Sequence, residues 1–196
     1  MIDRAPAALT SPGQPTLRTP RFVLRPFVPS DAPEVQRVAG TQSVADTTLT
    51  IPHPYPEGAA AAWIATHRPG WESRTQIVYA VIASTGALFG AVGLNLAPEH
   101  RRGELGYWVA PAHWNLGVAT EAAAALMDMG FQSLDLNRVQ ATHFTRNAAS
   151  GRVMQKLGMR FEGVHRQYFF KNGRFEDVAR YAMLRSEWQE RRESGG

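Results

Sequence analysis

The amino-acid sequence predicts one domain of mixed α/β (α+β) class, built around a sheet whose strands run in both directions. Three apolar segments in the first half of the chain have strand character, and from residue 104 onward strands and helices alternate. Near the end, Asn172-Gly173 separates two more strand-like segments, and this pair accepts the positive φ angles of a type I′ hairpin turn. Early strands followed by strand–helix alternation are typical of a mixed sheet.

Seven segments are expected as strands, because each is short and either continuously apolar or alternating in polarity. The fourth has a period of two from Glu104 to Val109, and Pro111 then prevents its ladder from continuing. A turn at residues 84–86 joins the second strand to the third. The expected strands are residues 22–26, 76–82, 87–94, 104–109, 138–144, 161–171 and 175–184.

Four helices are expected, at residues 30–38, 57–66, 117–131 and 148–157. Ser30-Asp31 is expected to cap the first. In the third, Ala123, Met127 and Phe131 recur every four residues and form an apolar face. For the fourth, Asn147 suits the N-cap and Gly158 suits the position after the last turn.

Three segments are expected to be irregular. Residues 44–56 carry Pro52, Pro54 and Pro56, which interrupt regular structure. Residues 1–16 are rich in proline and are expected to be a flexible lead-in. Residues 191–196 end in Ser-Gly-Gly and are expected to be a flexible tail, so the single domain is expected at residues 17–190.

Composition excludes several classes of protein. The 196 residues are 44% hydrophobic and 19% charged, which fits a globular protein with a sizeable core. No apolar run is long enough to span a membrane and no secretory signal is evident, so we expect a cytoplasmic protein without a membrane partner. The absence of cysteine excludes disulfides and a thiolate nucleophile. The histidines lack metal-ligand spacing, so no metal is expected.

The net charge of +4 leaves two interpretations open. A basic chain can bind nucleic acid. Alternatively, the charges are spread over solvated faces, and no block rich in Lys and Arg is present. We favour the second interpretation and expect no nucleic-acid partner, although excess positive charge would still attract a phosphorylated ligand.

The stretch from Trp114 to Glu121 predicts an anion site. It places Gly117 at the start of a helix, where four N–H groups lack intrahelical partners and the helix dipole is positive. Such helix starts bind phosphate. The stretch is neither a Walker loop nor a GxGxxG dinucleotide motif. An ordinary strand–turn–helix connection, with Gly117 only relieving crowding, is the alternative.

Trp114-Asn-Leu-Gly-Val-Ala-Thr-Glu121 follows one expected strand, and Asn147-x-x-Ser150 with Lys156-Leu-Gly-Met159 follows the next. In this order and spacing, the motifs resemble those of the GNAT superfamily of acetyl-coenzyme-A-dependent N-acetyltransferases. More narrowly, the chain resembles the RimJ/RimL-like branch in Thr19 to Pro26, Glu104-Leu-Gly-Tyr-Trp108 and Lys171-Asn-Gly-Arg-Phe-Glu-Asp177. The resemblance covers roughly residues 17 to 188.

The resemblance implies a GNAT fold: a mostly antiparallel sheet of six to seven strands, about four flanking helices, and a V-shaped splay between strands 104–109 and 138–144. Acetyl-CoA would lie in the splay, with its pantetheine arm against the backbone of Trp108, Val109 and Ala110, a form of strand addition. Its pyrophosphate would lie on the N–H groups of Asn115, Leu116, Gly117, Val118, Ala119 and Thr120.

Asn147 and Ser150 have two interpretations. As helix residues, Asn147 is a cap and Ser150 lies in the first turn, which requires no ligand. The resemblance implies that Asn147 contacts the pantetheine and that Ser150 lies near the thioester sulfur, where its hydroxyl could protonate the leaving thiolate. Capping and ligand contact are compatible with each other.

Glu104 is the leading candidate for the base, since acetyl transfer needs a neutral amine. The alternative is a carboxylate paired with Arg101, Arg102 or Arg138. Some relatives carry a Glu in the last hairpin where this chain has Phe169, which weakens both the base assignment and a ribosomal-protein substrate. A backbone N–H near Val109 could stabilise the oxyanion of the transition state.

Residues for the amine acceptor are expected in the first helices, their loop and the last hairpin. His53, Tyr55, Asn95 and Tyr168 are the candidates. Nearby Trp63 and Trp71 are favoured as core residues, and the histidines as surface residues.

The resulting hypothesis is an N-acetyltransferase that acts on the α-amine of a protein or peptide. A small-molecule amine, such as an aminoglycoside, a polyamine or an amino acid, is nearly as well supported. A non-catalytic acyl-CoA-binding module is a further alternative. A homodimer is plausible by family habit.

Overall fold

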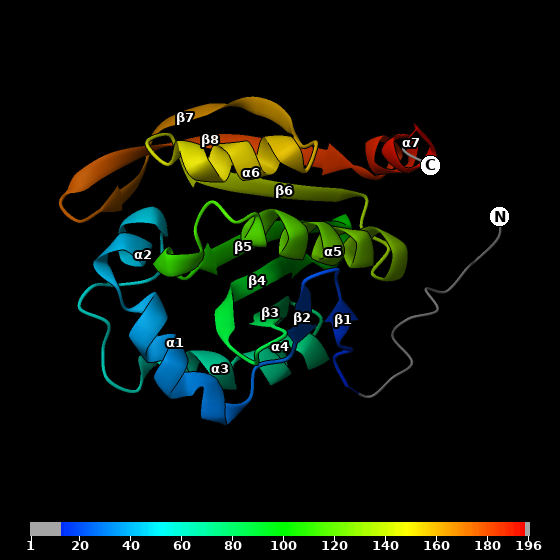
Figure 1. Ribbon diagram of the computed structural model, residues 1–196. Helices are drawn as coiled ribbons and strands as arrows, with labels where there is room; N and C mark the ends of the chain where they lie inside the picture. Colours follow the sequence, from blue (N-terminus) through cyan, green and yellow to red (C-terminus); the bar gives the residue numbers. More distant parts are fainter. Residues whose placement is uncertain (1–12, 195–196) are drawn as a thin grey trace.

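The computed structural model describes residues 13–194. Residues 1–12 and 195–196 lie outside this range, and with them most of the expected lead-in and the end of the expected tail. The described chain forms one eight-stranded sheet in the order β1-β2-β3-β4-β5-β6-β8-β7 (Figure 1). Every neighbouring pair of strands is antiparallel except β5 and β6, which run parallel.

All seven expected strands are present, and an eighth precedes them. The strands are β1 (Leu17–Arg18), β2 (Phe22–Arg25), β3 (Gln76–Ala83), β4 (Leu88–Ala97), β5 (Arg102–Val109), β6 (Arg138–Phe144), β7 (Arg160–Lys171) and β8 (Arg174–Leu184). The extra strand, β1, has two residues and is therefore too short to show a period of two. Asn172 and Gly173 both have positive φ, of 50° and 78°, as the expected hairpin turn requires.

The described residues form seven α-helices and three short 3₁₀ turns. They are α1 (Ala32–Ala39), α2 (Gln42–Thr47), α3 (Ala59–Ala65), α4 (His67–Glu72), α5 (Val118–Ser133), α6 (Ala148–Lys156), α7 (Arg185–Ser194), η1 (Pro29–Asp31), η2 (Pro98–His100) and η3 (Pro111–His113). The four expected helices correspond to α1, α3, α5 and α6.

The other three helices correct the sequence-based assignment. Helix α2 occupies the start of the loop expected at residues 44–56, and its six residues are too few to show an apolar period. Helix α4 contains Pro69, which is tolerated in a first turn. Helix α7 reaches Ser194, into the expected tail; it has no buried residue and is tied to α5 through Trp188, which donates to Asp128 at 2.6 Å.

One expected cap is also corrected. Asp31 makes no side-chain cap to α1. Its carboxylate instead accepts from the Val28 amide at 2.9 Å and pairs with the Arg25 guanidinium at 2.7 Å. Asp31 therefore fixes the 3₁₀ turn that leads from β2 into α1.

Helices cover both faces of the sheet (Figure 1). Helices α5 and α6 pack on one face, which we call the α5 face, with Leu126 and Phe131 in its core. The predicted apolar residues Ala123, Met127 and Phe131 are buried there. Helices α1, α2 and α3 pack on the other, the α1 face, with Val35 and Val44 in its core. No helix in residues 13–194 has the length and apolar character needed to cross a membrane.

His67 is buried in the core of the α1 face, at 5% exposure, and is not the surface residue that the sequence suggested. Its ring packs edge-on against Trp63 at 4.4 Å, and neither ring nitrogen has a hydrogen-bond partner in residues 13–194. Burial lowers the pKa of His67 from 6.5 to about 4. The folded protein therefore holds a neutral imidazole at a pH at which the unfolded chain is already protonated.

Stability is accordingly expected to fall as the pH drops from about 6.5 towards 4. Since the unfolded chain binds the extra proton in this window, His67 should lower the free energy of unfolding by about 2 kcal/mol between pH 7 and pH 5. Urea unfolding at both pH values measures this loss. His67→Phe keeps the aromatic packing and should remove most of it; an unchanged pH dependence in this variant would contradict the assignment to His67.

Candidate active site

Strands β5 and β6 diverge inside the sheet. They pair only over residues 102–104 of β5 and 138–140 of β6. Beyond that point β5 stays paired with β4 as far as Val109, and β6 stays paired with β8 as far as Phe144. The V-shaped splay implied by the resemblance is therefore present.

The splay exposes hydrogen-bonding groups of β5. The Ala110 amide donates to Phe89 at 2.8 Å, so this residue faces β4. Because the backbone groups of an antiparallel strand face opposite sides in alternation, those of Leu105, Tyr107 and Val109 face the gap. The Val109 carbonyl accepts from the Trp114 indole at 2.7 Å, which ties the following loop back to β5.

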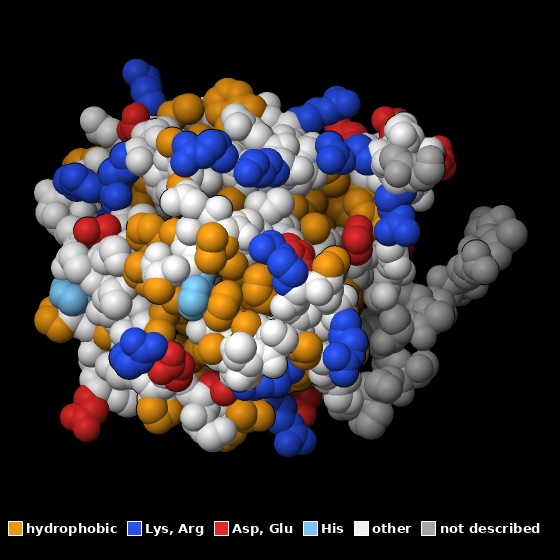
Figure 2. Space-filling view, viewed as in Figure 1, with side chains coloured by type: hydrophobic (Ala, Val, Ile, Leu, Met, Phe, Trp, Pro, Cys, Tyr) orange, Lys and Arg blue, Asp and Glu red, His pale blue; other side chains and the backbone are white. Residues whose placement is uncertain are grey.

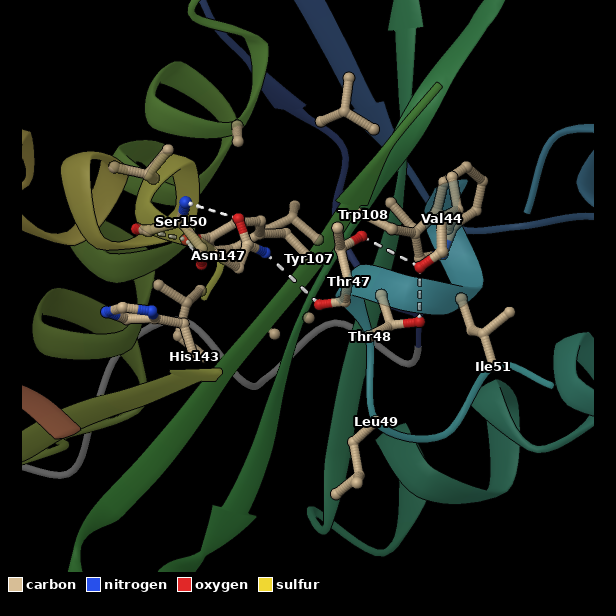
Figure 3. Close-up of a pocket in the computed structure, with 18 of the residues that line it drawn as sticks. Val44, Thr47, Thr48, Leu49, Ile51, Tyr107, Trp108, His143, Asn147 and Ser150 are labelled. Carbon is tan, nitrogen blue, oxygen red and sulfur yellow. Dashed lines mark hydrogen bonds between the residues drawn. The ribbon is translucent and has the colours of Figure 1, made fainter. Parts of the chain in front are cut away.

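A cavity of about 950 Å³ occupies the splay and reaches both faces of the sheet. Its lining on the α5 face includes Val118, Ser150 and Val153, and its lining on the α1 face includes Val44, Ile51 and Trp63. Figure 3 shows Ser150 and Asn147 on one side of it and Thr47, Thr48 and Ile51 on the other. Two ligands that meet in the splay could thus enter from opposite faces.

Ser150 and Tyr107 form a pair on the α5 face. The first turn of α6 places Ser150, whose backbone N–H is capped by the Asn147 side chain at 3.2 Å, as expected for an N-cap. The Ser150 hydroxyl lies 2.8 Å from the Tyr107 hydroxyl, which comes from β5. Burial raises the pKa of Tyr107 to about 12, although the hydrogen bond with Ser150 opposes this shift. Tyr107 therefore keeps its proton at neutral pH.

The N-terminus of α5 carries positive potential. Gly117 is its N-cap with φ of 76°, and the N–H groups that follow it, from Val118 to Thr120, have no partner within the helix. Arg21 lies beside this turn: it donates to the Leu116 carbonyl at 2.8 Å and pairs with Glu121 at 2.6 Å. Together with the helix dipole, this guanidinium makes the turn suitable for an anion.

Glu121 is kept charged beside Arg21. Burial alone would raise the pKa of its carboxyl, but hydrogen bonds from Thr19 and Arg21 outweigh burial and lower it. The Thr19 hydroxyl donates at 2.7 Å, and the Arg21 backbone N–H at 2.9 Å. Glu121 thus holds Arg21 in position over the turn.

Further positive charge lies on α6. Arg152 and Lys156 are one turn apart, and both line the cavity. Figure 2 shows Lys and Arg side chains along the part of the surface that α6 occupies. The part of the cavity on the α5 face would therefore attract phosphate groups.

Polar side chains form a row on the α1 face. Gln76, Asn95, Glu104 and Gln140 are direct partners across four neighbouring strands. The Glu104 carboxylate accepts from the Gln140 amide and from the Thr142 hydroxyl, each at 3.4 Å. It forms no ion pair within residues 13–194, because Arg138 pairs with Glu162 and Arg101 pairs with Asp135. Glu104 is thus a cavity-lining carboxylate held by neutral donors.

A pair of glycines forms the floor beside this row. Gly106 of β5 lies opposite Gly93 of β4. A Cβ atom built on Gly106 would meet nothing within 4 Å. The space between Glu104 and Trp108 is therefore open to a ligand.

Filling this space tests its role. Gly106→Val should preserve the fold, because valine suits a strand and its side chain would enter open space. We expect the acceptor KM to rise about tenfold or more, the equivalent of a lost contact of about 1.4 kcal/mol, while the Kd for acetyl-CoA stays within about twofold. Steady-state kinetics and calorimetry measure the two constants, with Gly106→Ala as the graded control. Equal KM values for all three proteins would place the acceptor elsewhere.

Most of the predicted site residues lie together in this cavity. Among the residues predicted for the cofactor, those that line it are Trp108, Val109, Asn115, Gly117, Val118, Ala119, Thr120, Asn147 and Ser150. Ala110 and Leu116 are not among its lining residues; the first faces β4, and the second is 54% exposed with its carbonyl bound to Arg21.

Two of the four predicted acceptor residues line the cavity, and two do not. Tyr55 and Asn95 line the cavity. His53 is exposed and its ring bonds to the Gly40 carbonyl at 2.9 Å, while Tyr168 is exposed on β7 and its neighbour Phe169 lines the cavity instead. Within residues 13–194, no cluster of His, Asp and Glu side chains is suited to hold a metal ion.

Sequence reasoning missed Arg21 and Tyr107 as site residues. Both stood in motifs that carried the resemblance, so a signal existed without an assigned role. The contact of Tyr107 with Ser150 joins residues 43 positions apart and needs the fold to be seen.

A splayed sheet with an anion site beside the splay is the arrangement of an enzyme suited to acyl transfer. The GNAT acetyltransferase domain matches residues 21–160, and the chain belongs to this family of acyltransferases.

Named relatives agree with the RimJ/RimL-like resemblance. An uncharacterized N-acetyltransferase of Bacillus subtilis, YoaA, is 32% identical over 87% of this chain and 97% of its own length. The ribosomal-protein-serine acetyltransferase of Escherichia coli is 31% identical over 50% of this chain and 55% of its own length. Spermidine N(1)-acetyltransferase of the same species is 30% identical over 45% and 48%. The last two are named for different acceptors, a ribosomal protein and spermidine.

Solved structures share the fold. A probable acetyltransferase, 25% identical, superposes with a TM-score of 0.82 over 90% of this chain and all of its own. RimL, an α-N-acetyltransferase of ribosomal protein L7/L12 solved with coenzyme A, superposes with a TM-score of 0.81 at 17% identity, over 87% of this chain and 98% of its own.

Proposed function

We propose that the protein transfers an acetyl group from acetyl-CoA directly to a primary amine, and that the acceptor is the N-terminal α-amine of a protein or peptide. The observation that carries this proposal is the single cavity that joins the anion site and Ser150 on one face to the Glu104 row on the other. Direct transfer is supported by the absence of cysteine from the chain.

The residues present fit acetyl-CoA. The gap-facing backbone groups of Tyr107 and the amide of Val109 offer strand-like partners to the amides of the pantetheine arm. The first turn of α5 and Arg21 suit the pyrophosphate. When bound, acetyl-CoA supplies an acetyl group activated as a thioester.

Ser150 is assigned the role of acid. Its hydroxyl carries the proton that the leaving thiolate requires. Tyr107 positions this hydroxyl at 2.8 Å and, with its raised pKa, stays protonated to donate to the Ser150 oxygen. The Val109 amide, which faces the gap, is the donor best placed to stabilise an oxyanion.

Glu104 is assigned the role of base. Its carboxylate lies in the cavity and has no cationic partner in residues 13–194, so it is free to attract an ammonium group and accept its proton. The neutral donors Gln140 and Thr142 hold it without neutralising its charge.

The lining on the α1 face favours one class of acceptor. It offers Glu104 as its carboxylate, and around it apolar residues such as Val44, Ile51 and Trp63. A polyamine would need several carboxylates for its charges, whereas an α-amine followed by a short or apolar side chain needs one. Because one relative acetylates spermidine, a small-molecule amine is the second candidate.

Calorimetric titration with acetyl-CoA, followed by a free-thiol assay over a panel of amines, tests the proposal. The panel contains peptides with free and with blocked N-termini, spermidine, an aminoglycoside and free amino acids. Thiol release with free but not blocked peptides supports the proposal. Release with spermidine alone would select the second candidate, and binding without release for any amine would favour a non-catalytic acyl-CoA-binding module.

A further inference from the structure

Lys171 is a buried lysine whose charge the chemistry above does not use. It ends β7, and its side chain is only 9% exposed. Its ammonium donates to the backbone carbonyls of Thr48, Leu49 and Ile51, the last two at 3.1 Å. All three protons of the ammonium are therefore used by a segment more than 100 residues away in the chain.

That segment forms one wall of the cavity on the α1 face. Residues 48–52, which we call the acceptor wall, contain no helix or strand, and all of them line the cavity. The carbonyls that Lys171 binds have no backbone partner among residues 13–194. A nearby tie to the rest of the site is the Asn147 amide, which donates to the Thr47 carbonyl at 3.5 Å (Figure 3).

The hairpin that carries Lys171 extends beyond the sheet. The pairing of β8 with β6 ends at Val178, so the hairpin end at residues 168–177 has no strand beside it on that side. It is anchored by Glu176, which is 6% exposed and pairs with Arg146 at 2.9 Å. Burial and the Arg146 guanidinium lower the pKa of Lys171, while Asp46 and Glu176 oppose this shift.

We propose that Lys171 is a positioning residue for the amine acceptor: its ammonium fixes the acceptor wall and thereby determines which amines fit beside Glu104. The link to an amine acceptor rests on the proposed function, whereas the claim that Lys171 fixes the wall does not. Without the ammonium, three carbonyls lose the donor that fixes them, and the wall, whose residues are half-buried or exposed, becomes free to move. The anion site on the α5 face would be unaffected.

The variant Lys171→Met tests this, because it keeps the length of the side chain and removes the donors. Limited proteolysis with thermolysin is expected to cut within residues 47–52 about tenfold or more faster, because a loop that loses its hydrogen-bonded ties opens more often. The acceptor KM should rise about tenfold with kcat changed by less than about threefold, and the Kd for acetyl-CoA should stay within about twofold. Arg166→Met, an exposed position on the same strand, is the matched control.

Unchanged cleavage in residues 47–52, or a loss that affects acetyl-CoA and the acceptor equally, would overturn the proposal. If Lys171→Met does not fold, Lys171→Arg replaces it: a longer planar donor should displace the wall and raise the acceptor KM alone, and an unchanged KM would count against the role. If no amine in the panel is acetylated, the proposed function fails, while the rate of cleavage in residues 47–52 on its own still decides whether Lys171 fixes the wall.

Discussion

Gly117→Asp is expected to weaken the binding of acetyl-CoA strongly while the protein still folds. The new carboxylate would lie in the first turn of α5, where the pyrophosphate is proposed to bind. A Cβ atom at this position lies 3.3 Å from the Arg21 guanidinium, so the carboxylate would also compete with Glu121 for that cation. Like charges about 4 Å apart near a protein surface repel by about 4 kcal/mol, so the affinity should fall by about a hundredfold to a thousandfold.

Gly117→Asn is the matched control for this variant. The φ angle of 76° is one that Asp and Asn tolerate better than other side chains, so both variants carry a similar conformational cost. Asn adds the same bulk without the charge. Calorimetry should give a much larger loss for Asp than for Asn, with equal circular dichroism spectra. Equal losses would mean that bulk alone matters, and no loss in either would remove the anion site.

Ser150→Ala is expected to reduce kcat by about a hundredfold or more, the usual contribution of a general acid, with the Kd for acetyl-CoA nearly unchanged. The helix should be unaffected, because Asn147 caps the backbone N–H of residue 150 and alanine favours helix. Single-turnover kinetics separate the chemical step from binding.

Tyr107→Phe is the companion variant. It removes the hydroxyl that positions Ser150 and leaves the ring in the core, so it should reduce kcat less than Ser150→Ala does. The double variant should be little worse than Ser150→Ala alone, because both act through one proton. Full activity in Ser150→Ala would leave Ser150 as a helix residue only.

The strands and the longer helices were predictable because their patterns are local. The alternation from Glu104 to Val109 and the Asn172-Gly173 turn each follow from neighbouring residues. Helices α2 and α7 were not, because α2 is only six residues long and α7 buries no residue. Their stability depends on what they contact, which a sequence pattern does not record.

Site residues that occupy local positions, such as helix starts, could be predicted from the sequence. Contacts between distant parts of the chain could not. Gly117 and Asn147 occupy local positions at helix starts, and both line the cavity. The hydrogen bond between Lys171 and Thr48 joins residues 123 positions apart, and no local sequence pattern predicts such a contact. His53 was chosen for its aromatic neighbours in sequence, yet its ring turns to Gly40, because the path of the loop decides where a side chain points.

The divergence of β5 from β6 also bears on solubility. A strand with unpaired N–H and C=O groups normally lies at the rim of a sheet, where it invites pairing with another chain and has to be blunted by charge, proline or a bulge. Of the two rim strands here, β1 has only two residues, and β7 is interrupted by two irregularities in its register with β8. In β5 the unpaired groups are enclosed instead, with strands on both sides and α5 over one face. The protein thus keeps a strand edge with unpaired backbone groups available to a narrow, extended ligand, while the neighbouring strands and α5 shield this edge from pairing with another chain.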